Sequence, residues 1–173
     1  MYRRILVPLD GSVLAEKVLP HAIAVAKAIG AEVTLVTVVQ HTLGGPGKAY
    51  LETLPEVVAE RKTAVNAEAK IYLEKVQREL KERGVAAHGD TLEGDVAAAI
   101  IGYAEQKGID LIAMATHGRS GLDRFILGSI AEKVVRGTLK PVLLIRALPV
   151  VPRPVDWSPG IPPPCHEPKS VIA

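Results

Sequence analysis

Short strand-like segments alternate along this chain with stretches of helical spacing. Apolar runs typical of buried strands span residues 5–7, 111–115 and 141–145, a strand rich in β-branched residues is predicted over 32–39, and a weaker one over 85–92. Between them, apolar residues recur every three or four positions, which predicts helices over 13–29, about 55–83, 96–107 and about 129–137. This alternation predicts a single-domain, doubly wound α/β fold with a mainly parallel sheet, in which ligands bind beyond the carboxyl ends of the strands.

Local signals refine the helix boundaries. Ser12 and Asp95 are placed to cap the helices that follow them. Thr53 and Glu56 have the spacing of a capping box at the start of the longest helix. Pro20 lies inside the first helical stretch, where we expect it to kink or split the helix.

Composition narrows the class of protein. The chain has 173 residues, 48% of them apolar, and a net charge of only +2, which argues against nucleic acid or an acidic membrane surface as a partner. No apolar run reaches the roughly 18 residues of a membrane span, and the apolar run after the first four residues is too short for a signal peptide. Cys165 is the single cysteine, which excludes an intramolecular disulfide framework. We therefore expect a soluble, cytoplasmic protein.

The last 27 residues, 147–173, differ from the rest of the chain in composition. Eight of the 27 residues in 147–173 are proline, and the helical or strand periodicity is lost there. We expect a folded domain over 1–146 and an extended or disordered tail over 147–173.

The segment with the most candidate ligand-binding residues follows the predicted strand 111–115. It contains Gly118, Gly121 and the pair Gly128-Ser129, which stands directly before a helical pattern, together with Arg119. A strand, a glycine-bearing loop and a helix start together favour a bound phosphate, because backbone N–H groups and the helix dipole attract negative charge. The same glycines also occur in ordinary turns, and Ser129 and Asp10 in ordinary caps and turns, so both readings stay open at this point.

Other phosphate motifs are absent from the sequence. There is no G-x-x-x-x-G-K-[ST] string, and the turn 10–12 lacks the glycines of a dinucleotide fingerprint. Residues 116–129 contain no lysine, and His117 has no Ser, Cys or carboxylate placed to form a triad with it. Phosphoryl transfer needs charge stabilisation and a positioned nucleophile, so the sequence favours binding over turnover.

Together these segments resemble the universal stress protein family over roughly residues 3–146. The resemblance is carried by the strings 7–12 (VPLDGS), 110–112 (DLI), 116–122 (THGRSGL), 127–129 (LGS) and 140–145 (KPVLLI). It implies a five-stranded parallel sheet of order 3-2-1-4-5 with helices on both faces. It also implies a homodimer formed through the last strand, Pro141 to Ile145.

Within that family, the resemblance extends to the ATP-binding branch. That branch carries the motif G-x-x-G followed by nine residues of any kind and then Gly-Ser or Gly-Thr. Here Gly118 and Gly128-Ser129 match, but Ala115 replaces the first glycine, and its methyl group would crowd the ligand if that backbone needed positive φ. The resemblance implies ATP as ligand, with Mg²⁺ bridging its phosphates. The implied contacts are Pro8, Asp10, Val38, Met114, Ala115, Gly118, Arg119, Gly121, Gly128, Ser129 and Ile130.

Three hypotheses follow. The leading one is an ATP-binding homodimer that senses or holds nucleotide and acts through a protein partner. The second is a nucleotide-free dimer in which the loop is only structural, and the third is a slow ATP hydrolase.

Overall fold

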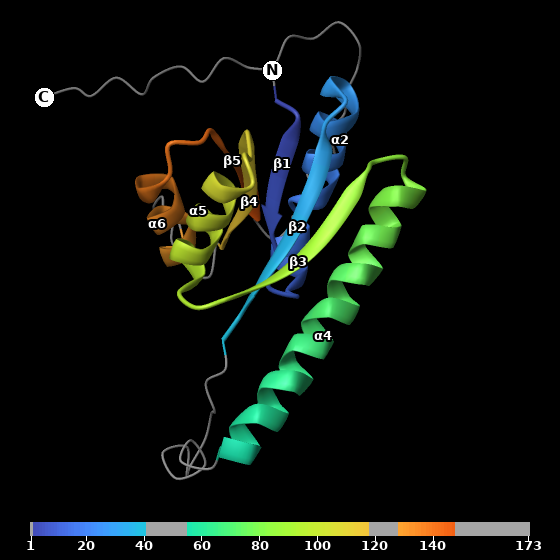
Figure 1. Ribbon diagram of the computed structural model, residues 1–173. Coiled ribbons are helices and arrows are strands. Elements are labelled where there is room, and N and C mark those ends of the chain that lie inside the picture. Colours follow the sequence, from blue (N-terminus) through green and yellow to red (C-terminus); the bar gives the residue numbers. More distant parts are fainter. Residues whose placement is uncertain (1, 41–54, 118–127, 148–173) are drawn as a thin grey trace, which may run out of the picture.

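The computed structural model describes residues 2–40, 55–117 and 128–147. Within these ranges five strands form one sheet, and every neighbouring pair runs parallel. Their order is β3-β2-β1-β4-β5, which confirms the predicted fold class and strand order (Figure 1). The strands are β1 (Arg4–Pro8), β2 (Glu32–Val39), β3 (Ala87–Glu93), β4 (Leu111–His117) and β5 (Val142–Ala147).

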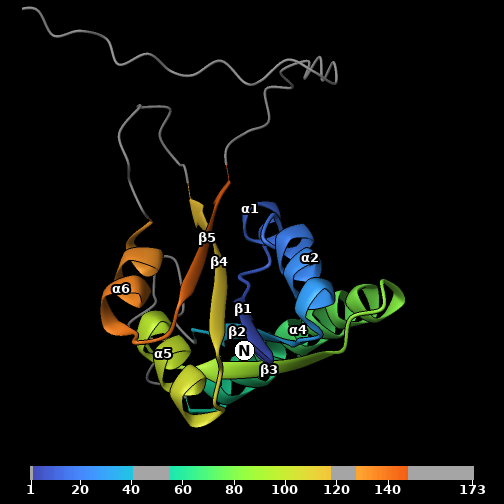
Figure 2. The same ribbon diagram turned by 90° about the horizontal axis from the view of Figure 1, so that it is seen from above.

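Helices cover both faces of the sheet (Figure 2). The helices α1, α2 and α4 pack on the face that carries Ile5 and Val7, whereas α5 and α6 pack on the face that carries Leu6. These three β1 residues are 0% exposed, so β1 joins the two layers of the core. The helices are α1 (Val13–Glu16), α2 (Leu19–Ile29), α4 (Pro55–Glu82), α5 (Val96–Gln106) and α6 (Ser129–Gly137).

The longest helix, α4, uses only part of its length for the core. Its buried residues are Ala69, Leu73, Val76 and Leu80, all in its carboxyl-terminal half. Figure 1 shows the other end projecting past the sheet. Among the helices of the described ranges, none is long and apolar enough to cross a membrane.

The predicted break at Pro20 is present, and it separates two helices. The proline lies in the first turn of α2. N–H groups of a first turn have no hydrogen-bond partner within the helix, so the absence of an N–H in proline costs no helical hydrogen bond there. The predicted caps are also confirmed, since Ser12 and Asp95 accept hydrogen bonds from the N–H groups of Ala15 and Ala98 at 3.1 and 3.0 Å.

Strand ends differ from the prediction by about two residues. β4 continues past Ala115 to His117 because it stays in register with β5 up to the pair His117–Ala147. β5 correspondingly spans Val142–Ala147 and not 141–145, and β3 begins two residues later than predicted. The predicted capping residue Thr53 and the segment 148–173 lie outside the described residues.

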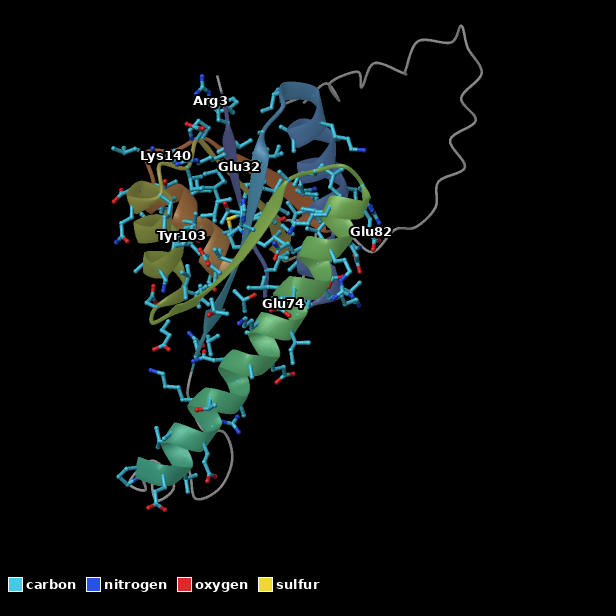
Figure 3. All side chains as sticks on the ribbon, turned by 45° about the vertical axis from the view of Figure 1, so that its right-hand side comes forward. Arg3, Glu32, Glu74, Glu82, Tyr103 and Lys140 are labelled. Atoms are coloured by element: carbon cyan, nitrogen blue, oxygen red, sulfur yellow. The ribbon has the colours of Figure 1, made fainter. Side chains whose placement is uncertain are left out.

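Side chains tie the amino-terminal ends of three strands together (Figure 3). Asp110 accepts hydrogen bonds through Oδ2 from the backbone N–H groups of Arg3 and Arg4, at 2.8 and 3.1 Å. The Arg4 guanidinium donates to Glu32 Oε1 at 3.0 Å and to the carbonyl oxygen of Lys107 at 2.8 Å. The two N–H groups stabilise the charged carboxylate and thereby lower the pKa of Asp110.

This shift predicts a pH-dependent effect of Asp110→Asn. The pKa of Asp110 is lower in the folded than in the unfolded chain, so its stabilisation is present above the unfolded pKa and is lost as pH falls through the folded pKa. We expect the variant to melt at a lower temperature at pH 7, and the two melting curves to converge below the ordinary aspartate pKa of about 3.9. A difference that does not change with pH would contradict this account.

Candidate functional site

The two central strands separate near their carboxyl ends. The register between β1 and β4 consists of two pairs and ends at Leu6 and Ile112. Beyond these residues β1 stays with β2 up to Pro8, while β4 stays with β5 up to His117. Figure 2 shows the two halves of the sheet diverging there. Strand order reverses at this point, and in open α/β sheets such a reversal is where ligands bind.

The turn after β1 bounds one side of this opening. The Oδ1 atom of Asp10 accepts a hydrogen bond from the N–H of Ser12 at 2.9 Å. Gly11 between them has a φ of +76°, a conformation that favours glycine. α1 starts directly after Ser12 and packs against β4. The local hydrogen bond therefore orients the Asp10 carboxylate, which is exposed, at the end of β1.

Three predicted site residues share one apolar cluster. Met114 is 5% exposed and belongs to the cluster on the α5 and α6 face. Val38 of β2 and Ile130 in the first turn of α6 are partly buried and pack against that cluster. The structure thus brings together side chains from three elements, two of which are only partly buried.

Ala115 lies on the opposite face of the sheet. It is 8% exposed and belongs to the cluster on the α1 and α2 face, because alternate residues of a strand point to opposite faces. Its φ is not positive, since only glycines have positive φ among the described residues. The condition under which its methyl group would crowd a ligand is therefore not met. If a ligand lies on the Met114 face, Ala115 could contact it only through its backbone.

The start of α6 differs from those of α1 and α5. Its N-cap is Gly128, which has no side chain to accept a hydrogen bond from the first turn, and no other side chain of residues 2–40, 55–117 and 128–147 is recorded as capping it. Gly128 has φ −54° and ψ 146°, angles that any residue adopts, so the backbone conformation does not demand glycine. The first N–H groups of a helix have no partner within it, and in α6 they lie beside the exposed Ser129.

The remaining predicted residues divide into two groups. Pro8 is the half-buried last residue of β1. Gly118, Arg119 and Gly121 lie outside the described residues, so their contacts stay predictions.

Sequence reasoning missed one pair of residues that bears on this site. The Tyr72 hydroxyl of α4 donates a hydrogen bond to Glu16 Oε1 of α1 at 3.1 Å. Burial, this hydrogen bond and the nearby charges of Glu16 and Asp10 raise the pKa of Tyr72. The two partners are 56 residues apart in the chain, and no spacing in the sequence signals their contact.

The model of the universal stress protein family matches residues 1–146. The chain belongs to this family. Universal stress protein MJ0531 of Methanocaldococcus jannaschii is 37% identical over 148 residues, which cover 84% of this chain and 83% of the relative. Among solved structures, the universal stress protein MJ0577 of the same organism has a TM-score of 0.70 at 32% identity, covering 84% of this chain and 96% of that chain. UspA from Lactobacillus plantarum has a TM-score of 0.69 at 27% identity, covering 84% and 98%.

The position of Ala115 predicts the effect of restoring the family's glycine. Ala115→Gly removes a buried methyl group and adds backbone freedom to the unfolded chain. We expect the free energy of unfolding to fall by about 1 kcal/mol, measured by urea denaturation. Unchanged stability would show that the methyl group contributes nothing to the core of this universal stress protein.

Proposed function

We propose that this chain is an ATP-binding regulatory protein that works as a homodimer and acts through a protein partner. The observation that carries the proposal is the start of α6. Gly128 stands there without a conformational need for glycine, no side chain of the described residues is recorded as capping the helix, and Ile130 packs onto the cluster that holds Met114. A helix start with a glycine N-cap, next to partly buried apolar side chains, suits a ligand that joins a phosphate to a flat ring.

The residue roles follow from this arrangement and from the family motif. The adenine would lie on Val38 and Met114, with Pro8 at the end of β1 beside it. Asp10 would accept hydrogen bonds from the adenosine moiety. The phosphates would bind the N–H groups from Ser129 onward. By motif position, they would also bind Gly118, Arg119 and Gly121.

Mg²⁺ would be carried mainly by the nucleotide. Among the described residues, no group of three or more His, Cys, Asp or Glu side chains could hold a metal ion. Phosphate oxygens and water are the ligands that Mg²⁺ usually takes in nucleotide sites, and the exposed hydroxyl of Ser129 would be one candidate ligand from this chain.

A nucleotide complex has been solved for one protein of the same fold. A universal stress protein solved in complex with cAMP has a TM-score of 0.61 with this chain and covers 85% of it. Its 20% identity shows the shared fold alone. ATP is proposed here because Gly118 and Gly128-Ser129 keep the spacing of the ATP-binding branch.

Substitutions at Gly128 test the phosphate site. We expect Gly128→Ala to weaken Mg²⁺–ATP binding about tenfold and Gly128→Val to weaken it more than about a hundredfold, because added side-chain atoms fill the phosphate position. The fold should survive, since φ −54° and ψ 146° suit both residues. Isothermal titration calorimetry measures the affinities, and circular dichroism checks the fold. Wild-type affinity in a folded Gly128→Val would place the phosphates elsewhere.

The two edges of the sheet favour one mode of dimerisation. On the edge strand β3, five of seven residues are exposed, and they include His88 and Asp90, which suits an edge that faces water. On the opposite edge, Val142 to Ile145 are all apolar and only partly buried. We propose that β5 pairs with β5 of a second copy, which would cover these side chains.

This dimer predicts different effects for two matched substitutions. Ile145→Glu places a charge on the proposed interface, whereas Ile71→Glu places one on α4 at a residue that is 68% exposed. Sedimentation velocity should give twice the mass of a single chain for the wild type and for Ile71→Glu, and one chain mass for Ile145→Glu. A wild-type monomer at micromolar concentration would contradict the proposed dimer.

A further inference from the structure

The short helix α1 cannot hold its own position. It has four residues, Val13–Glu16, and a single helical turn is not stable in isolation. Its first turn is fixed by Ser12 Oγ, which accepts from the N–H of Ala15, and by the turn at Asp10. Ala15 also packs into the core. The last residue, Glu16, needs a further contact if the helix is to stay against β4.

Tyr72 supplies that contact from the long helix α4. Its hydroxyl donates to Glu16 Oε1 at 3.1 Å in a partly buried setting, and its ring packs against the apolar cluster that contains Ala15 and Ala115. A hydrogen bond to a carboxylate is stronger than one between neutral groups, and partial burial limits competition from water. The charge of Asp10 also acts on the same phenol, so the turn after β1 lies near it.

We propose that Tyr72 is a positioning residue for the nucleotide site, because its hydrogen bond to Glu16 holds α1 and the Asp10 turn against β4. The part of this inference that concerns ATP rests on the proposed function. The part that concerns the position of α1 does not. Tyr72 touches no ligand in this account and acts only through Glu16.

The chain offers a matched control on the other face of the sheet. Tyr103 of α5 donates a hydrogen bond to Asp90 of β3, which is again a contact between a tyrosine hydroxyl and a carboxylate (Figure 3). That pair joins a helix to the edge strand two places from β1. Tyr103→Phe therefore removes the same chemistry as Tyr72→Phe, but away from the opening between β1 and β4.

The experiment compares Tyr72→Phe, Tyr103→Phe and Glu16→Gln with the wild type. Two quantities are measured: Mg²⁺–ATP affinity by calorimetry, and amide hydrogen exchange of residues 12–18 without nucleotide. Tyr72→Phe should weaken ATP binding roughly three- to tenfold and speed exchange in 12–18 by a similar factor. Tyr103→Phe should change neither quantity, even if it lowers the melting temperature as much. Glu16→Gln keeps an acceptor oxygen for Tyr72 but removes its charge, so both effects should be smaller than those of Tyr72→Phe.

The two readouts separate the inference from the proposed function. If the wild type binds no ATP, the proposed function fails, and exchange in 12–18 still decides whether Tyr72 holds α1. Unchanged exchange in Tyr72→Phe would overturn the inference. It would also be overturned by faster exchange with wild-type ATP affinity, or by equal effects of Tyr72→Phe and Tyr103→Phe on residues 12–18.

Discussion

The separation of β1 from β4 is the constraint on which the rest of this structure depends. β1 is the centre of the sheet and residues 5–7 in it are fully buried, and after Leu6 its one strand neighbour among the described residues is β2. β4 turns the other way and follows β5 to its last residue. The chain therefore leaves β1 toward α1 on one face and reaches α6 on the other. An opening between two strand ends, bounded by two helix starts, follows from the strand order itself.

The two helices that start at this opening differ in their N-cap residues. α1 is capped by its own Ser12, which satisfies one of its N–H groups. α6 begins at a glycine without a cap, although a serine or aspartate there would stabilise the helix and fits the observed backbone angles. The glycine cap costs a little stability, and in the proposed function the first N–H groups of α6 would bind a phosphate instead. This contrast is the physical basis for placing the phosphates at α6 and the adenosine near α1.

Sequence patterns predicted the fold because each element carries a local signal. Buried parallel strands read as apolar runs, and Ser12, Pro20 and Asp95 mark helix boundaries by their own chemistry. The carboxyl end of β4 carries no such signal, because Thr116 and His117 belong to the strand only through pairing with β5. Family resemblance named Met114 and Ala115 together, but strand alternation sends them to opposite faces.

Long-range contacts lay beyond sequence reasoning for a different reason. The sequence predicts Tyr72 as one member of an apolar helical stripe and Glu16 as a polar residue of the helix predicted over 13–29. Only the folded packing of α4 against the α1 side of the sheet brings them to 3.1 Å.

The most direct test of the central claim is to denature the purified protein and identify any nucleotide that it releases. The account predicts adenine nucleotide, released in proportion to the protein, or, if purification strips it, saturable binding of added Mg²⁺–ATP with one site per chain. A folded protein that releases no nucleotide and binds none at millimolar ATP would contradict the account.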